Sequence, residues 1–368
     1  MTTHIFIVDS NTFKYHLEYQ FAGTGAKEYR VDFLINPNIN LSRKESSSEC
    51  LLVGMIADCQ RIRVGDLIIF YLQGGGFYGV FRVKQVPFLD NNDGNQFLKD
   101  GLKKSLTFRT LIEPHQVYAE GVTEWEALDE IKNVQSPHQM LWTLIYRKLE
   151  GNRGNTMITM FESERLIKLI SDKNKGISLK GNNFTFNAHN QKIEINSSIN
   201  NYSGRQIPID ILPRLIYKYN KGNQFETHLQ AYLTQNIDKL PFFIDEKIEW
   251  IGNEIYCGFG EQSIDIMLSI NGENRKVIPI ELKSTVAPFG ITDQIKRYVD
   301  WIEQYYLPNY LPNHNSKIEP MIISREIKNK NSTDYQNLVS ALNNFKLKLR
   351  YVEFKILNDE ILFEEIQY

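Results

Sequence analysis

The sequence predicts two folded domains: an α+β block of mostly strands at the N-terminus, and an α/β block with a mixed central sheet at the C-terminus. A chain of 368 residues is too long for one ordinary domain. The first part contains a strand, a run of glycines and a second strand, whereas the last part alternates helices and strands in the order α-β-β-α-β-α-β. Such alternation favours a sheet flanked by helices.

The composition is that of a folded protein, with 42% hydrophobic and 23% charged residues. The 42 basic and 44 acidic side chains nearly cancel, so any binding of nucleic acid must come from local patches. The three cysteines form no C-x-x-C motif, which argues against a zinc ribbon and a disulfide framework. No apolar run is long enough to span a membrane. We therefore expect a cytoplasmic protein that is neither exported nor membrane-bound.

Short strands joined by turns are the main feature of the N-terminal block. Residues 5–8 form an apolar strand, and the Asp9-Ser-Asn-Thr cluster after it is suited to cap a helix. Further on, the apolar runs 67–72 and 77–83 are separated by three glycines, Gly74 to Gly76. Glycines there suit a ligand-binding mouth or a tight hairpin, and the spacing favours the hairpin.

A basic segment follows at residues 171–221. It carries eight basic and three acidic side chains, a net charge of 8 − 3 = +5, and its short apolar runs are separated by Gly, Asn and Ser clusters. We predict a linker or a small β insert between domains at 1–170 and 222–368. Its charge indicates either a solvated surface or an approach path for a phosphate backbone.

A second predicted hairpin carries the chemistry of the C-terminal block. The strands 263–270 and 277–283 flank an Asn-Gly turn, and a turn centred near Glu273 places Asp265 opposite Glu281. Lys283 then shares a face with Glu281. Two carboxylates this close repel unless a cation such as Mg²⁺ or Mn²⁺ bridges them. The pattern predicts metal-dependent phosphodiester chemistry, although a solvated hairpin face gives the same short pattern by chance.

Two helices flank this hairpin in the sequence. The first, near 225–233, places Glu226 on the same face as leucines, where an acid requires a polar partner. The second, near 292–301, places Gln294, Tyr298 and Trp301 on one face. Both helices can therefore direct polar groups toward the hairpin.

The C-terminal order and motif resemble the P-D…(D/E)-x-K nuclease superfamily, most closely the archaeal and bacterial NucS type, over about 222–360. The sequence has Ile264 at the position of the family's proline, which is commonly variable. The resemblance does not extend to the NucS dimerising domain, so mismatch specificity is not implied. It implies metal ligation by Asp265 and Glu281, a catalytic Lys283, and supporting roles for Glu226, Gln294 and Tyr298.

Residues 1–170 resemble the EVE domains of the PUA-like superfamily, relatives of the YTH readers. The resemblance rests on the strand 5–8 with Ser10, on 64–71, on 74–80 and on 144–156. It implies a small barrel, and many family members hold a flipped-out modified base between aromatic side chains. The tryptophan often found after the first helix is absent. The candidate pocket residues are Ser10, Asn11, Phe21, Tyr71, Phe77 and Trp142, and each aromatic ring among them has a core position as its alternative.

Together these features predict a metal-dependent endonuclease of the restriction type that cuts double-stranded DNA with a restriction-endonuclease-like C-terminal domain, while the EVE-like domain inspects the DNA for a modified base. Arg153, Lys218 and Lys221 are candidate contacts to the DNA backbone. A double-strand cut by one active site per chain requires two copies, so we expect a homodimer. The alternatives are a NucS-like repair nuclease on mismatched or branched DNA and a catalytically inactive reader. The seven histidines form no zinc-binding pair, and no nucleotide-binding loop occurs.

Overall fold

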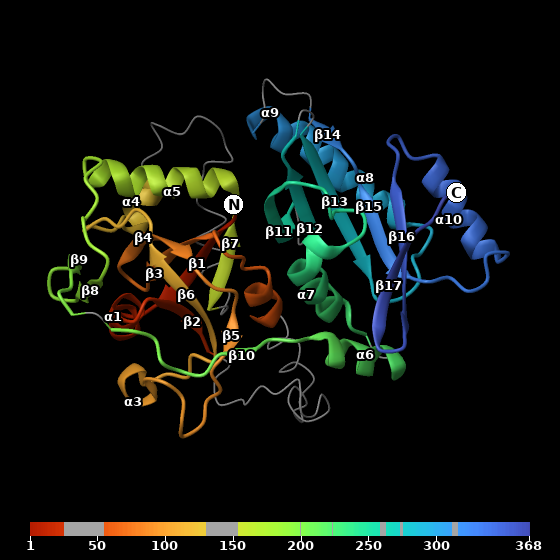
Figure 1. Cartoon of the computed structure of the whole chain (residues 1–368). Helices are drawn as coiled ribbons and strands as arrows, with labels where there is room; N and C mark the ends of the chain where they lie inside the picture. Colours follow the sequence, from red (N-terminus) through yellow and green to blue (C-terminus); the bar gives the residue numbers. More distant parts are fainter. Residues whose placement is uncertain are drawn as a thin grey trace. The chain divides into compact units, whose positions relative to one another are not determined.

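The computed structural model describes residues 1–25, 55–129, 154–198, 200–222, 224–257, 263–272, 275–310 and 316–368. Two compact units divide the chain, the first at Met1–Asp210 and the second at Ile211–Tyr368 (Figure 1). Both units combine helices with a mixed sheet, so the chain is α+β. Within the described ranges, no helix has the length and apolar character needed to cross a membrane.

A half-barrel sheet is the centre of the first unit, in the order β10-β5-β6-β4-β3-β1-β7 with β2 paired to β6. Its strand β1 pairs in parallel with β3 and antiparallel with β7. The helices of this unit include α1 (Ser10–Glu18), α3 (Lys99–Leu102), α4 (Glu124–Asp129) and α5 (Met160–Lys173), and residues 55–60 are also helical. The strands are β1 (Thr3–Val8), β2 (Phe21–Thr24), β3 (Leu67–Leu72), β4 (Gly76–Val83), β5 (Phe88–Leu89), β6 (Phe108–Pro114), β7 (Asn155–Ile158) and β10 (Ile207–Pro208).

Two local predictions for this unit are confirmed. Asp9 caps α1, because its side chain accepts a hydrogen bond from the Thr12 amide at 2.8 Å. The β3–β4 hairpin closes with Leu72 opposite Gly76. Gly76 has φ of 148°, and a Cβ there would lie 2.2 Å from a backbone oxygen of Val122. Only glycine fits that close approach.

The basic segment 171–221 is divided between the two units. Its first part completes α5, and β8 (Phe184–Asn187) and β9 (Lys192–Ile195) then form a hairpin against α1. Phe184, Phe186 and Ile193 are buried in the core of the first unit. The segment through Asp210 therefore belongs to the half-barrel, and α6 (Leu212–Asn220) begins the second unit.

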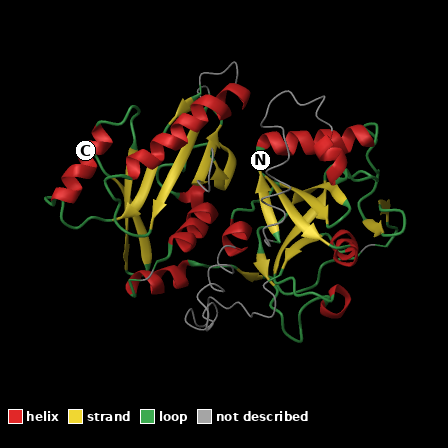
Figure 2. Cartoon of the chain, turned by 180° about the vertical axis from the view of Figure 1, so that it is seen from behind, coloured by secondary structure: helices red, strands yellow, loops and turns green. Residues whose placement is uncertain are grey.

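The second unit has a sheet flanked by helices (Figure 2), and its strands lie in the order β11-β12-β13-β15-β16-β17, with β14 paired to β13. Strands β13, β15 and β16 run parallel, whereas β11, β12 and β17 are antiparallel to their neighbours. The strands are β11 (Ile248–Tyr256), β12 (Ser263–Ile270), β13 (Lys276–Lys283), β14 (Lys317–Ile318), β15 (Met321–Arg325), β16 (Arg350–Leu357) and β17 (Glu360–Glu365). The helices are α6, α7 (Glu226–Asn236), α8 (Ile291–Trp301), α9 (Leu307–Tyr310) and α10 (Thr333–Asn343).

Helices cover both faces of this sheet. Leu229 and Leu233 of α7 pack with Ile266 and Ile280, whereas Tyr298 of α8 contacts Glu281, the next residue along β13. Successive strand residues point to opposite faces, so α7 and α8 lie on opposite faces of the sheet. The predicted order of helices and strands from α7 to β16 is present, and β11 and β17 are edge strands that the sequence pattern did not indicate.

Candidate active site

The β12–β13 hairpin brings two acids together at one end of the sheet. The pair of residues furthest from the turn in the hairpin register is Ile266 with Ile280. One residue further along each strand, Asp265 is opposite Glu281, as predicted from the position of the turn. The amide of Leu282 donates a hydrogen bond to Asp265 Oδ2 at 2.8 Å. That bond fixes the Asp265 carboxylate between the ends of the two strands.

Glu281 is the most enclosed acid of the site, with 1% of its surface exposed. Its Oε1 accepts a hydrogen bond from the ammonium of Lys283, two residues along the same strand. Its Oε2 accepts one from the Tyr298 hydroxyl at 2.8 Å. Lys283 is held further by the carbonyl of Leu282, 3.0 Å from its Nζ. Both oxygens of Glu281 are therefore oriented by groups on β13 and α8.

Glu226, the first residue of α7, reaches the same end of β13. Its Oε2 accepts a hydrogen bond from the Ser284 amide at 3.3 Å, and its Oε1 lies 4.0 Å from Lys283 Nζ. One helical turn further, Gln230 donates from Nε2 to the Asp265 carbonyl at 2.7 Å. Sequence reasoning missed Gln230, and its spacing of four residues from Glu226 was the available signal.

The Gln294–Tyr298 pair of α8 closes the site from the other face. Gln294 Nε2 donates to the Tyr298 hydroxyl at 2.6 Å, and that hydroxyl lies 2.8 Å from both Glu281 Oε2 and the Ser263 carbonyl. A phenol has a single proton to donate. The Glu281 carboxylate and the Ser263 carbonyl compete for this proton, so the hydroxyl cannot donate to both at once. This favours a state in which Glu281 is protonated or its charge is offset by a cation.

Burial is the leading influence on the charges of the cluster, and repulsion between the acids adds to it. Burial, and then the charge of Glu281, raise the pKa of Asp265 well above its ordinary value. Burial also raises the pKa of Glu281, and its contacts with Lys283 and Tyr298 only partly oppose this. Burial alone would lower the pKa of Lys283, but the surrounding carboxylates raise it, led by Glu281. Lys283 is therefore a charged hydrogen-bond donor in this arrangement.

The donor set suits a hard divalent cation. Mg²⁺ is commonly held by one or two carboxylates, with waters and substrate phosphates completing its shell. Asp265 and Glu281 supply two carboxylates here, and burial is the leading cause of the raised pKa of each. In the described ranges, no group of three or more His, Cys, Asp or Glu side chains is placed to hold a metal ion. A cation here would therefore rely on these two acids and on non-protein ligands.

The candidate base-pocket residues of the first unit are dispersed. The aromatic rings of Phe21, Tyr71 and Phe77 are in the hydrophobic cores, with 0%, 8% and 0% exposed. Asn11 donates from Nδ2 to the Gly101 carbonyl at 2.9 Å, beside α3. Ser10 lines a cavity, described below. Trp142 lies outside the described residues. The rings that the structure describes therefore pack inward and form no open cage.

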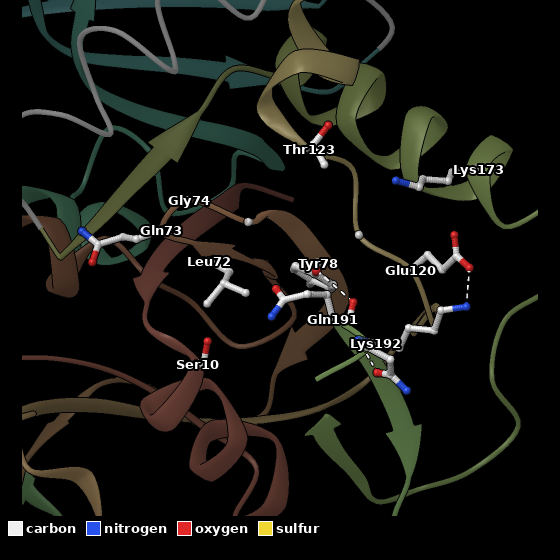
Figure 3. A pocket seen from close by; sticks show the side chains of 13 residues that line it. Ser10, Leu72, Gln73, Gly74, Tyr78, Glu120, Thr123, Lys173, Gln191 and Lys192 are labelled. Carbon is white, nitrogen blue, oxygen red and sulfur yellow. Dashed lines mark hydrogen bonds and ion pairs between the residues drawn. The ribbon is translucent and has the colours of Figure 1, made fainter. Parts of the chain in front are cut away.

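The cavity next to Ser10 has a volume of about 530 Å³ and lies at the β3–β4 turn (Figure 3). Its walls are mostly polar: Glu120 pairs with Lys192 at 2.7 Å, and the Tyr78 hydroxyl donates to the Gln191 carbonyl at 3.0 Å. The lining residues are Ser10, Leu72, Gln73, Gly74, Gly75, Tyr78, Glu120, Gly121, Thr123, Lys173, Asn190, Gln191 and Lys192. This volume is in the usual range for small-molecule sites.

Two of the three candidate backbone contacts lie together at the end of one helix. Lys218 is partly buried and Lys221 exposed, at the C-terminal end of α6 in the second unit. Arg153 lies outside the described residues.

No family model and no curated protein match this chain. Among solved structures, a crystal structure of a Pseudomonas putida protein from the Northeast Structural Genomics Consortium shares 11% sequence identity with it. The alignment covers 45% of this chain and 98% of that protein, with a TM-score of 0.27. A likeness this low identifies neither a family nor an activity, so the function is argued from the site alone.

Proposed function

We propose that this chain is a metal-dependent DNA endonuclease of the P-D…(D/E)-x-K type, with its active site in the second unit. The observation that carries the proposal is the meeting of Asp265, Glu281 and Lys283 at one end of the β12–β13 hairpin. Two mutually repelling acids beside a charged lysine are costly to bury, which argues that the cluster has a chemical role.

Asp265 and Glu281 are the proposed ligands of Mg²⁺ or Mn²⁺, which when bound polarises a water and a phosphate oxygen. Lys283 is proposed to donate a hydrogen bond to the attacking water or to the scissile phosphate, because its raised pKa keeps it protonated. Tyr298 and Gln294 hold Glu281 in place, and Glu226 holds the Ser284 amide at the end of β13. These three side chains orient the reacting centre.

We further propose that the first unit is a PUA-like, EVE-type domain that inspects DNA for a modified base, and that the nuclease acts as a homodimer in the cytoplasm. The half-barrel sheet supports the domain assignment. The aromatic rings buried in the core do not support the cage, so the cavity beside Ser10 becomes the preferred place for recognition in the described part of this unit.

Plasmid cleavage is the test of this function. Matched plasmids, unmodified or carrying N6-methyladenine or modified cytosines, would be incubated with Mg²⁺ or Mn²⁺ and either wild type or Lys283→Ala. Cleavage of one modified plasmid, lost in the variant, supports both domain roles. Cleavage of all plasmids supports the nuclease and removes the modification reader. Cleavage of mismatched or branched DNA alone selects a repair nuclease, and metal-independent binding without any product selects an inactive reader.

A further inference from the structure

The loop that leaves the active site exposes two large apolar side chains. This edge loop, residues 284–290, connects Lys283 at the end of β13 to Ile291 at the start of α8. Val286 is 48% exposed and Phe289 is 63% exposed. Ala287, between them, is buried. The loop therefore directs its two largest apolar groups to the surface and keeps a small one inside.

Hydrogen bonds fix the backbone of the edge loop. The Ser284 amide donates to Glu226 Oε2 at 3.3 Å, and the Thr285 carbonyl accepts from the Arg325 amide at 3.0 Å. At the other end, the Ile291 amide donates to the Pro288 carbonyl at 3.1 Å. Because the loop is tied to α7, β15 and α8, its exposed side chains stand on a defined base next to the catalytic groups.

The same end of the sheet carries a second exposed ring and a cation. Tyr256, the last residue of β11, is 38% exposed and pairs with Ser263, two residues before Asp265. Arg297 is exposed on α8 close to Cys257: burial raises the pKa of the Cys257 thiol to about 12, and the charge of Arg297 partly opposes that rise. Apolar, cationic and catalytic side chains thus share one edge, a combination suited to a nucleic acid strand.

We propose that Phe289, supported by Val286, is a wedge that inserts against the bases of the DNA next to the bond to be cut. This rests on the proposed nuclease function. A phosphate that reaches Lys283 brings its flanking nucleotides over the edge loop, since only residues 284–288 separate Lys283 from Phe289. Apolar side chains that enter a duplex unstack a base step, and an aromatic ring recovers part of that cost by stacking on the exposed base.

The substrate class that follows is DNA whose stacking is easily opened. Unstacking costs least at flexible pyrimidine–purine steps and at mismatched or damaged pairs. A wedge at the active site would therefore favour cutting at such steps, whatever base the first unit recognises. The preference is a property of the second unit alone.

Binding to DNA that contains 2-aminopurine tests the wedge without relying on cleavage. The full chain would be titrated in EDTA into short duplexes with 2-aminopurine at successive positions, unmodified or modified as in the plasmid assay. The variants are Phe289→Ala, Val286→Ala and, as a matched control, Ile244→Ala. Ile244 is 64% exposed and precedes β11 at the end of the sheet where Ile248 pairs with Ile270, away from Asp265.

We expect wild type and Ile244→Ala to raise the fluorescence at one position and to bind with equal affinity. Phe289→Ala should lose the fluorescence rise and bind about five- to a hundredfold more weakly, the usual range for one base–aromatic stack. Val286→Ala should show a smaller loss. Wild-type behaviour of Phe289→Ala would overturn the wedge and leave the nuclease intact. Binding sensitive to Phe289 in a chain that cuts no DNA would retain the wedge and overturn the nuclease, and no binding by wild type would overturn both.

Discussion

Two glutamates on one sheet have nearly the same partners and different surroundings. Glu281 on β13 accepts hydrogen bonds from Lys283 and Tyr298, and Glu353 on β16 accepts them from Lys330 and Tyr351. Both are almost fully buried, with 1% and 4% exposed. A lysine and a tyrosine beside a buried glutamate therefore do not by themselves distinguish a catalytic site from a structural one.

The neighbouring group on the sheet distinguishes the two glutamates. Glu281 lies opposite the carboxylate of Asp265, whereas Glu353 pairs in register with Ser324, whose hydroxyl lies 3.2 Å from the Tyr351 hydroxyl. Glu353 also accepts a hydrogen bond from the Ile327 amide at 3.3 Å. The Glu353 cluster is satisfied internally. The Glu281 cluster contains one more acid, Asp265. A bound cation would offset the charge of that acid.

The largest contrast is expected between the two lysines. Lys283→Ala should lower the rate of DNA cleavage by about 10²- to 10⁴-fold, because it removes the charged donor nearest the two acids. Lys330→Ala removes the matched lysine of Glu353 and should leave the rate unchanged. Plasmid cleavage with Mg²⁺ measures both. Equal losses in the two variants would mean that the Lys283 cluster has no special chemical role.

A second contrast concerns the stability contributed by two aspartates, the partly buried Asp265 and the buried Asp66. Asp265→Asn should abolish cleavage and, without metal, raise the free energy of unfolding by on the order of 1–4 kcal/mol, since it removes a charge that is repelled by Glu281. Asp66→Asn should lower the free energy of unfolding by about 1–3 kcal/mol. Asp66 accepts hydrogen bonds from the Thr2 and Arg63 amides, both at 2.9 Å, and from His4 at 3.0 Å. Denaturant unfolding in EDTA measures both changes.

The pH dependence of these two effects has opposite signs. Because the pKa of Asp265 is raised in the folded protein, the folded state binds more protons than the unfolded state above about pH 4. The contribution of Asp265 to the stability of the fold therefore falls as pH rises, until the pH passes the pKa of the folded state. Burial would raise the pKa of Asp66, but its hydrogen bonds lower it. Its stabilisation is present above about pH 4 and is lost on acidification below that. A destabilised Asp265→Asn protein at neutral pH would contradict this account.

The hairpin of the active site could be predicted from the sequence because its cause is local. The Asn271-Gly turn and the alternation of 263–270 and 277–283 determine which residues face each other, and so Asp265 meets Glu281. Glu226 and Tyr298 followed from helical spacing next to that hairpin. The arrangement of these acidic, lysine and tyrosine side chains therefore needed only short-range patterns and one resemblance.

The remaining features depend on packing that no local pattern contains. Whether Phe21, Tyr71 and Phe77 face a ligand or the core depends on which layers cover the half-barrel, and here both faces carry hydrophobic cores. The edge strands β11 and β17 have weak patterns and are stabilised by pairing with β12 and β16. The sequence left a linker and a small β insert open for 171–221, because the buried phenylalanines of the β8–β9 hairpin meet α1 only in the folded chain.

The smallest contrast is expected between the two tyrosines, and it tests positioning alone. Tyr298→Phe removes one hydrogen bond to Glu281 and should lower the free energy of unfolding by about 1 kcal/mol. Tyr351→Phe removes the matching bond to Glu353 and should cost a similar amount. The two variants should differ in cleavage: about tenfold slower for Tyr298→Phe, since about 1.4 kcal/mol of orientation is lost, and unchanged for Tyr351→Phe. If the two variants are equally stable and only Tyr298→Phe cuts more slowly, Tyr298 orients a carboxylate that takes part in cleavage. Equal cleavage rates in the two variants would mean that Tyr298 has a structural role alone.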